Sequence, residues 1–319
     1  MSDARPTPIA NLLATLDLEE VGAVEVSLRP RRPQGQEGPS DLPSLFNEDV
    51  TVFLGQSQKM PHGRVFGGQV LAQCVMAAGR TVGAEGDATT RPIHSLHAYF
   101  MRPGDDTAPI HFTVERMRDG ASFSTRRVHA IQHGATILAA SASFQAPAGG
   151  LDHQEPMPAV PAPEELPSLT EVVDRYADPT AGAIARRRPV DLRHVDGALF
   201  YSVPEQSARQ SVWMRTIGAL PDDPLIQAAT LAYCSDYTLL EPILRRHSLP
   251  WSDRRLRMAS LDHAMWFHRP GRVDDWVLYD QCTPSARSGR GLGVGKMFTR
   301  DGTLIATVAQ EGMVRVKGL

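Results

Sequence analysis

The chain contains an internal repeat, and this repeat constrains the fold more than any other feature of the sequence. The segment 93–104 ends in Arg-Pro-Gly, and the segment 260–271 ends in the same three residues at an offset of 167 (271 − 104). Upstream, Leu-Ala-Gln-Cys at 71–74 matches Leu-Ala-Tyr-Cys at 231–234 at an offset of 160 (231 − 71). Two matches in one order at nearly one offset indicate a duplicated domain. We therefore look for function where the two copies differ.

Each copy predicts one helix followed by a run of antiparallel strands. In the first copy the helix is expected at 69–78, and the strands at 93–100, 109–117, 122–132 and 135–145. In the second copy a helix at 225–244 lies among strands at 189–195, 211–217, 256–268, 275–283, 290–299 and 303–316. Ahead of the repeat we expect a helix at 11–20 and a strand at 49–54. This order is typical of an α+β fold and not of a doubly wound α/β sheet.

The two copies are separated by a segment rich in proline. Residues 146–168 contain six prolines and almost no periodicity, which is typical of a linker. The sequence therefore predicts an N-terminal unit at 1–148, a linker at 149–187 and a C-terminal unit at 188–319. Within the first unit, residues 29–44 are rich in Pro, Gly and Arg and are expected to form an exposed or partly disordered loop.

Composition excludes several classes of function. The chain of 319 residues has 42% hydrophobic and 22% charged residues, and its formal net charge of −3 gives no basic field for nucleic acid. No apolar run approaches the ~18 residues of a membrane span. Three cysteines without metal-ligand spacing predict free thiols and no metal site. The first residues lack an apolar signal core, and the last three are Lys-Gly-Leu, so the cytoplasm is the expected location.

One acidic residue stands out in the second predicted helix. Asp236 is the only charged residue between positions 226 and 240, and the first copy has Met76 at the equivalent position. A buried carboxylate costs several kcal/mol unless it is paired or hydrogen-bonded. It is therefore either a structural Asp bonded to nearby polar groups or a general base whose pKa is raised by desolvation. Because a structural need should recur in both copies, the asymmetry favours the base.

Two polar residues on the following strands are further candidates. Strand alternation places Gln310 on the same face as three apolar side chains, and the first copy has Ala142 at that position. An inward amide can hold a water or a substrate oxygen, whereas a Gln at the core edge would simply reach solvent. Ser260 precedes Asp262 and His263, but these neighbours point to opposite faces of a strand and no Gly-x-Ser-x-Gly elbow is present. We expect Ser260 to act as a hydrogen-bonding partner and not as a nucleophile.

Weaker candidates surround these residues. The glycine-rich run at 287–296 fits no phosphate-loop spacing, although Arg287 and Arg290 are positioned in it to meet phosphates. His62 precedes the Val-Phe-Gly-Gly-Gln segment at 65–69 and is a candidate for lining a site. Gly67 and Gly68 begin the first predicted helix, where free backbone N–H groups can stabilise an oxyanion.

Taken together, these motifs resemble those of the acyl-CoA thioesterase II family. The resemblance spans roughly 9–148 and 188–316, and it is carried by the segments at 65–70, 94–104, 118–123 and 142–146 and by those at 231–236, 259–270 and 309–312. It implies a double hotdog fold, in which two long helices are each wrapped by an antiparallel sheet and the sheets join side by side. The segment 27–48 looks longer than in the shorter family members.

The resemblance also implies a chemistry. It implies hydrolysis of acyl-CoA thioesters without a metal or organic cofactor, in which the family's catalytic Asp, Ser/Thr and Gln fall on Asp236, Ser260 and Gln310. These residues would hold one water, and Asp236 would take its proton as the water attacks the thioester carbonyl. Assembly into a dimer or larger homo-oligomer of double hotdogs is likewise expected from the resemblance.

Two alternatives remain open at this point, because a fold does not fix a reaction. The first is an enoyl-CoA hydratase, which would need an Asp/His pair, and Asp236 has no His within a helical turn or two. The second is a non-catalytic acyl-CoA binding protein, which would bind CoA without releasing thiol.

Overall fold

The computed structural model describes residues 6–28, 46–61, 63–83, 91–176, 182 and 185–318. Its helices are α1 (Pro8–Leu16), α2 (Gly67–Gly79), the short 3₁₀ turn η3 (Pro163–Glu165), α3 (Leu169–Asp174), α5 (Pro224–Ser235) and α6 (Glu241–Arg246). The strands of the first repeat and the segment before it are β1 (Glu19–Leu28), β2 (Phe46–Gly55), β3 (Ile93–Phe100), β4 (Ile110–Asp119), β5 (Phe123–Gln132) and β6 (Ala135–Gln145). Those after the linker are β7 (Val190–His194), β8 (Arg209–Thr216), β9 (Leu256–Ser260), β10 (Asp262–Phe267), β11 (Val277–Arg287), β12 (Arg290–Thr299) and β13 (Leu304–Val316).

All of these strands belong to one antiparallel sheet. Its order is β1-β2-β4-β5-β6-β3-β10-β13-β12-β11-β8-β7, with β9 paired to β13. The two repeats meet where β3 pairs with β10, and Ala264 lies opposite His97. These two residues are equivalent at the repeat offset of 167 (264 − 97), so a pseudo-two-fold axis passes through this pair. The α+β architecture and the side-by-side joining of two sheets are both confirmed.

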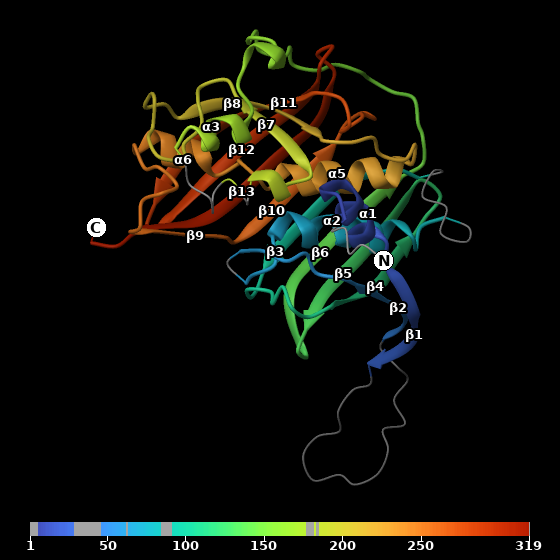
Figure 1. Ribbon diagram of the computed structural model, residues 1–319. Helices are drawn as coiled ribbons and strands as arrows, with labels where there is room; N and C mark the ends of the chain where they lie inside the picture. The colour runs from blue at the N-terminus through green and yellow to red at the C-terminus, as the bar shows by residue number, and fades with distance from the viewer. Residues whose placement is uncertain are drawn as a thin grey trace, which may run out of the picture.

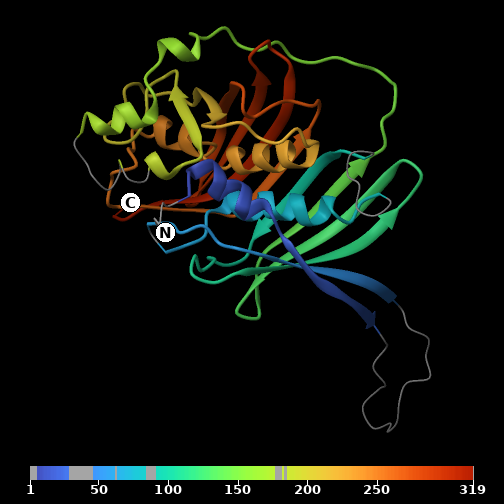
Figure 2. The same ribbon diagram turned by 45° about the vertical axis from the view of Figure 1, so that its right-hand side comes forward.

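The helices α2 and α5 lie side by side in the concave side of the curved sheet (Figures 1 and 2). Helix α2 is almost completely buried, and α5 is buried from its second turn to its end except at Ala228, as expected for helices without a charged face. Their contact is close, because the missing side chain of Gly68 brings the two backbones together: a Cβ there would lie 2.5 Å from the carbonyl oxygen of Tyr233. One hydrophobic core runs through both repeats, with Leu71 and Leu231 near its centre.

The N-terminal segment differs from the prediction. The helix expected at 11–20 is displaced, because α1 starts after Thr7, whose hydroxyl accepts the N–H of Ala10, and ends at Leu16. A strand, β1, begins at Glu19 and pairs with β2. This hairpin projects from the body of the molecule (Figure 2). The two strands include both ends of the 27–48 segment, whereas the predicted loop at 29–44 lies outside the described residues.

The predicted helix at 225–244 is also wrong in one respect, since it is interrupted. The first helix, α5, ends at Ser235, residues 236–240 form turns, and α6 starts at Glu241. Pro242 explains the break, because a proline inside a helix has no N–H to donate and its ring collides with the carbonyl four residues earlier, here Thr238. The interruption leaves Asp236 as the C-terminal cap of α5, at the end of the helix and not in its middle.

The segment between the repeats packs on the second one. The indole N–H of Trp213 donates to the carbonyl of Pro161 over 3.0 Å, and the Arg193 guanidinium donates to the carbonyls of Pro163 and Leu166. Gln154 exchanges hydrogen bonds with the backbone of the turn before β13. The predicted strands of both repeats are found within a few residues of their expected ends, except that the segment 256–268 is divided into β9 and β10.

Candidate active site

Asp236 lies where the end of α5 meets the start of α2. Its Oδ1 accepts a hydrogen bond from Gln310 Nε2 over 2.9 Å, and its carboxylate also bonds the backbone N–H of Gly68 and the Ser260 hydroxyl. Burial raises the pKa of Asp236 to about 6, and the three donors oppose this rise only in part. Asp236 keeps some accessible surface, which leaves a route for water. The site therefore combines a helix end from each repeat.

Gln310 connects the predicted residues to one another. From the middle of β13, its Nε2 donates to Asp236 and also to Ser260 Oγ over 2.5 Å. The side chain is almost completely buried, so both of its donors are used within the protein. The structure thus brings Asp236, Ser260 and Gln310 into direct contact.

A bulge in the sheet makes this convergence possible. Ser260 on β9 pairs with Gly312 on β13, and Ala264 on β10 pairs with Ala309 on β13. Between these two pairs the chain advances by four residues from β9 to β10 (264 − 260) but by only three along β13 (312 − 309), so β9–β10 contains one extra residue. In a regular strand, Ser260 and His263 would point to opposite faces. The extra residue at the junction of β9 and β10 turns both toward Gln310, which is the effect that bulges have near functional sites.

Sequence reasoning missed two members of this cluster, His263 and Ser235. His263 is completely buried, its Nδ1 lies 2.8 Å from Gln310 Oε1, and its Nε2 lies 2.9 Å from Ser235 Oγ. The alternation argument placed Asp262 and His263 on opposite faces, and Asp262 lies outside the cluster, where it accepts a hydrogen bond from the backbone N–H of Glu311. It could not place His263 next to Ser260, because the bulge is invisible in residue spacing.

Comparison of the two copies would have identified these residues. At the same offsets, the counterparts of Asp236, Ser260 and Gln310 are the buried hydrophobic residues Met76, Ile93 and Ala142. The counterparts of Ser235 and His263 are likewise hydrophobic and completely buried, Val75 and Leu96. The pseudo-two-fold axis therefore relates a polar cluster to an apolar one, and only the polar cluster can do acid–base chemistry.

Gly67 keeps open the space in front of the carboxylate. A Cβ at this position would lie 2.8 Å from Asp236 Oδ2 and 2.9 Å from the Phe100 ring. At these distances a side chain would displace the Asp236 carboxylate or the Phe100 ring. A small substrate group or a water can approach Asp236 from this side only because position 67 has no side chain.

Aromatic side chains form the neighbouring wall. Tyr237 stacks on Phe66 with ring centroids 4.8 Å apart, and Tyr233 meets Phe66 edge-on at 5.1 Å. The Arg188 guanidinium lies 5.2 Å from the centre of the Tyr237 ring. The Tyr233 hydroxyl donates a hydrogen bond to the Gln58 side-chain oxygen over 2.8 Å, which links this wall to the first repeat. The site is thus polar at Asp236 and apolar beside it.

The remaining predicted residues do not join this cluster. Arg290 pairs with Glu311 at 3.1 Å, and Arg287 is exposed at the other end of the β11–β12 turn. Glu311 neighbours Gln310 on β13 and so points to the opposite face of the sheet. Gly67 and Gly68 lie directly at Asp236, whereas His62 lies outside the described residues.

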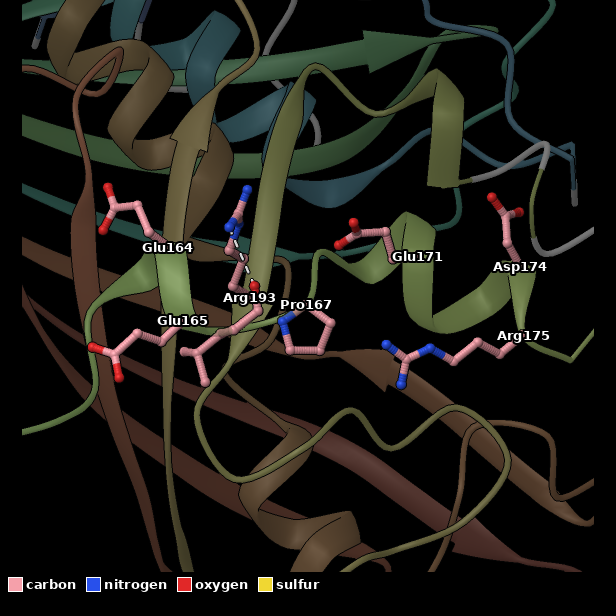
Figure 3. Close-up of a pocket in the computed structure, with 8 residues that line it drawn as sticks. Glu164, Glu165, Pro167, Glu171, Asp174, Arg175 and Arg193 are labelled. Carbon is pink, nitrogen blue, oxygen red and sulfur yellow. Dashed lines mark hydrogen bonds between the residues drawn. The ribbon is translucent and has the colours of Figure 1, made fainter.

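A hollow in the described surface lies elsewhere. It has a volume of about 740 Å³ and is lined by the linker and β7, with Glu164, Glu171 and Arg193 among its residues (Figure 3). None of the predicted site residues lines it. Within the parts of the chain that the structure describes, no group of three or more His, Cys, Asp or Glu side chains is placed to hold a metal ion. The described helices include none long and apolar enough to cross a membrane.

Comparison with known proteins gives a consistent result for both repeats. A family model described as acyl-CoA thioesterase matches residues 201–313, and a second, described as acyl-CoA thioesterase N-terminal domain, matches residues 56–145. Acyl-CoA thioesterase 2 of Haemophilus influenzae is 38% identical over 278 residues, covering 86% of this chain and 96% of that protein.

Solved structures agree with the sequence relatives. The crystal structure of an acyl-CoA thioesterase II from Mycobacterium marinum is similar with a TM-score of 0.71 and 38% identity, covering 96% of this chain and 99% of that one. A hot dog fold protein from Alicyclobacillus acidocaldarius is similar with a TM-score of 0.66 and 20% identity, covering 83% of this chain and 93% of that one. The double hotdog fold is thereby confirmed.

Proposed function

Because this chain belongs to the acyl-CoA thioesterase II family, we propose that it hydrolyses acyl-CoA by means of a water activated by Asp236. The chain is an acyl-CoA thioesterase, so its substrate is an acyl-CoA. The observation that carries the residue assignment is the contact between Asp236, Gln310 and Ser260 at the junction of the two repeats. The asymmetry of the repeats supports this assignment, since the equivalent positions of the first repeat hold apolar side chains.

The reaction needs a base that is ionised near neutral pH and still basic. With a pKa of about 6, Asp236 is mostly ionised at pH 7 and is a stronger base than an exposed aspartate. The attacking water binds the free side of the carboxylate, beside Gly67, and gives its proton to Asp236. The water oxygen forms a bond to the thioester carbon, the carbon–sulfur bond breaks, and the CoA thiolate takes up the proton. Base assistance of this kind contributes about 10²–10⁴-fold.

The other groups orient this step. Gln310 and Ser260 hold the carboxylate in one position, and Gly68 bonds it from the start of α2. The N–H of Gly67, the first residue of α2, is the available donor for the thioester oxygen as negative charge develops on it. No covalent acyl-enzyme is required, so Ser260 carries no acyl group during turnover.

The first experiment measures thiol release from a panel of acyl-CoAs of short to very long chain. Asp236→Asn should lower kcat by about two orders of magnitude or more, since it removes the base while keeping the shape of the side chain. Asp222→Asn is the matched control, because Asp222 is fully exposed and pairs only with Arg272 at 3.0 Å. Equal rates in wild type and a folded Asp236→Asn variant would contradict the assignment. Acyl-enzyme trapped on Ser260 in quenched samples would contradict the mechanism.

The same panel reports on the substrate, since chain preference follows from the rates. Binding of CoA in thermal melts without thiol release on any chain would favour the acyl-CoA binding alternative. Association of double hotdogs into a homo-oligomer and a cytoplasmic location stay predictions. The first is measured by light scattering and the second by fractionation.

A further inference from the structure

The orientation of the Gln310 amide decides whether the site can work. Both N–H groups of Gln310 donate to Asp236 and Ser260, and its oxygen faces His263. If the amide rotated by half a turn, its oxygen would face the Asp236 carboxylate and repel it. An amide has no preference of its own between these two orientations, so a neighbouring group must select one.

His263 is placed to make that selection. Its Nδ1 lies 2.8 Å from Gln310 Oε1, which can only accept, so Nδ1 carries a proton and donates it. In a neutral ring Nε2 then accepts, and the Ser235 hydroxyl 2.9 Å away is the donor. The Ser235 hydroxyl also lies 2.9 Å from the carbonyl oxygen of Ala232 on α5, which is the other acceptor to which it can donate. The hydroxyl has one proton, so in this arrangement it turns from the Ala232 carbonyl to the imidazole, and the neutral ring carries its proton on Nδ1.

We propose that His263 is a positioning residue, whose Nδ1–H holds Gln310 in the orientation that directs both of its N–H groups to Asp236 and Ser260, with Ser235 fixing the imidazole tautomer. This inference rests on the proposed function and deepens it. His263 acts through Gln310 and does not touch the carboxylate itself.

The surroundings keep the imidazole neutral. Burial lowers the pKa of His263 to about 4, so the ring stays uncharged across the range in which Asp236 is ionised. From β11, Tyr279 faces the same space and donates to the Ser235 carbonyl over 3.1 Å, and burial raises its pKa. From α5 and the turn after it come Tyr233 and Tyr237, with Arg188 over the latter. Among the described residues, no ion pair reaches Asp236 or His263.

The fold itself does not require these polar groups. In the first repeat, Leu96 and Val75 fill the equivalent positions and are completely buried in the same packing between strand and helix. A buried imidazole and hydroxyl cost free energy unless they are fully bonded. Their presence in only the repeat that has Asp236 is the expected result if they serve that residue.

A matched pair of variants tests the proposal. His263→Asn keeps an N–H donor at the same number of bonds from the backbone as Nδ1, whereas His263→Leu has nearly the same shape and no donor. We expect Leu to lower kcat by about tenfold or more with KM within about threefold, and Asn to stay within about threefold of wild type. Because Asp236 loses its Gln310 donor, the acid limb of the kcat profile should move to higher pH in the Leu variant only.

The control is His268→Leu, because His268 is exposed and its imidazole bonds the Thr307 hydroxyl over 2.8 Å, away from the Asp236 cluster. The kcat and pH profile of this variant should match wild type. Two results overturn the proposal: a folded His263→Leu variant with the kcat and acid limb of wild type, or an Asn variant as impaired as the Leu variant. Failure of the proposed function looks different, since Asp236→Asn would then match wild type.

A spectroscopic measurement keeps the proposal testable even if the Leu variant fails to fold. In wild-type protein labelled with ¹⁵N-histidine, comparison with His263→Asn assigns the His263 signals among the 11 histidines. We expect an Nδ1–H tautomer that does not titrate between about pH 5 and 8. An Nε2–H tautomer, or titration near the ordinary histidine pKa of about 6.5, would overturn the proposal whatever the activity.

Discussion

At the scale of single residues, the environment of Asp236 determines what this side chain can do. Three donors stabilise the ionised form: the Gln310 amide, the Gly68 backbone and the Ser260 hydroxyl. Desolvation by the surrounding protein outweighs them and leaves the pKa at about 6. A carboxylate with donors but no burial would be too acidic to take a proton from water, and burial without donors would leave it protonated at neutral pH.

The rate should therefore depend on pH in a defined direction. As pH falls through about 6, Asp236 becomes protonated and can no longer accept a proton, so kcat should fall about tenfold per pH unit below that value. The measurement follows loss of thioester absorbance at saturating acyl-CoA, which excludes effects on substrate binding. A kcat that stays constant down to about pH 4, the ordinary range of an exposed aspartate, would contradict a raised pKa in the enzyme–substrate complex.

Stability should change with pH in the opposite sense. The pKa of Asp236 is about 6 in the folded chain and 3.8 for an ordinary aspartate, so between these values the folded state holds more protons. Stability from this group is then lost as pH rises from about 4 to about 6. The Asp236→Asn variant does not suffer this loss. Its free energy of unfolding minus that of wild type should therefore increase as pH rises from about 4 to about 6, and should be constant above about pH 6. Urea titrations between about pH 4 and 8 measure the difference.

The contribution of His263 to these titrations has the opposite sign. Burial lowers its pKa from 6.5 to about 4, so its contribution to stability increases as pH rises through that interval. Wild type and Asp236→Asn both retain His263, so the contribution of His263 cancels when their free energies of unfolding are subtracted. A difference in unfolding free energy that does not change with pH would contradict the raised pKa of Asp236.

Most of what could be predicted about the site came from comparing equivalent residues of the two repeats. Asp236 and Gln310 could be identified because their counterparts are Met76 and Ala142. Ser260 could be singled out by residue type and resemblance. The phosphate role of Arg287 and Arg290 rests on local composition alone and stays a prediction, because local composition does not report on which face of a sheet a side chain lies.

At the scale of elements, the site depends on two irregularities. Pro242 ends the run of α5 before α6, which leaves Asp236 at a helix end, and the bulge between β9 and β10 turns Ser260 and His263 to one face. The helix break could have been predicted from the proline. The bulge could not, because it depends on pairing with β13, and register is a property of two strands that one segment does not contain.

The start of α2 offers a test at this scale. Gly67→Ala should support the helix, because alanine has a higher helix propensity than glycine. Its Cβ would nevertheless lie 2.8 Å from Asp236 Oδ2, in the space assigned to the attacking water. We expect kcat to fall about tenfold or more in a protein that still folds. Gly149→Ala is the control, since a Cβ there meets no atom within 4 Å, and wild-type activity in Gly67→Ala would contradict the placement of the water.

At the scale of the whole molecule, the two repeats form one structure because they share both a sheet and a core. The β3–β10 pair joins the sheets, and α2 packs on α5 beneath that joint. The proposed active site crosses the boundary as well, since Gly67 and Gly68 come from the first repeat and Asp236 from the second. Neither repeat alone therefore contains all of the proposed site, although the second carries the proposed base, Asp236, together with Ser260 and Gln310.

Shared packing predicts unfolding in a single cooperative transition. All four tryptophans, Trp213, Trp251, Trp266 and Trp276, lie in the second repeat, although Trp266 also meets His97 of β3 edge-on at 5.2 Å. Their fluorescence therefore reports mainly on the second repeat, whereas far-ultraviolet circular dichroism reports on both. Because separating the repeats would expose the α2–α5 contact and the edges of β3 and β10, we expect the two signals to give one coincident midpoint in urea. A circular dichroism transition with a second step that the fluorescence does not follow would show that the first repeat unfolds independently, and would contradict a common core.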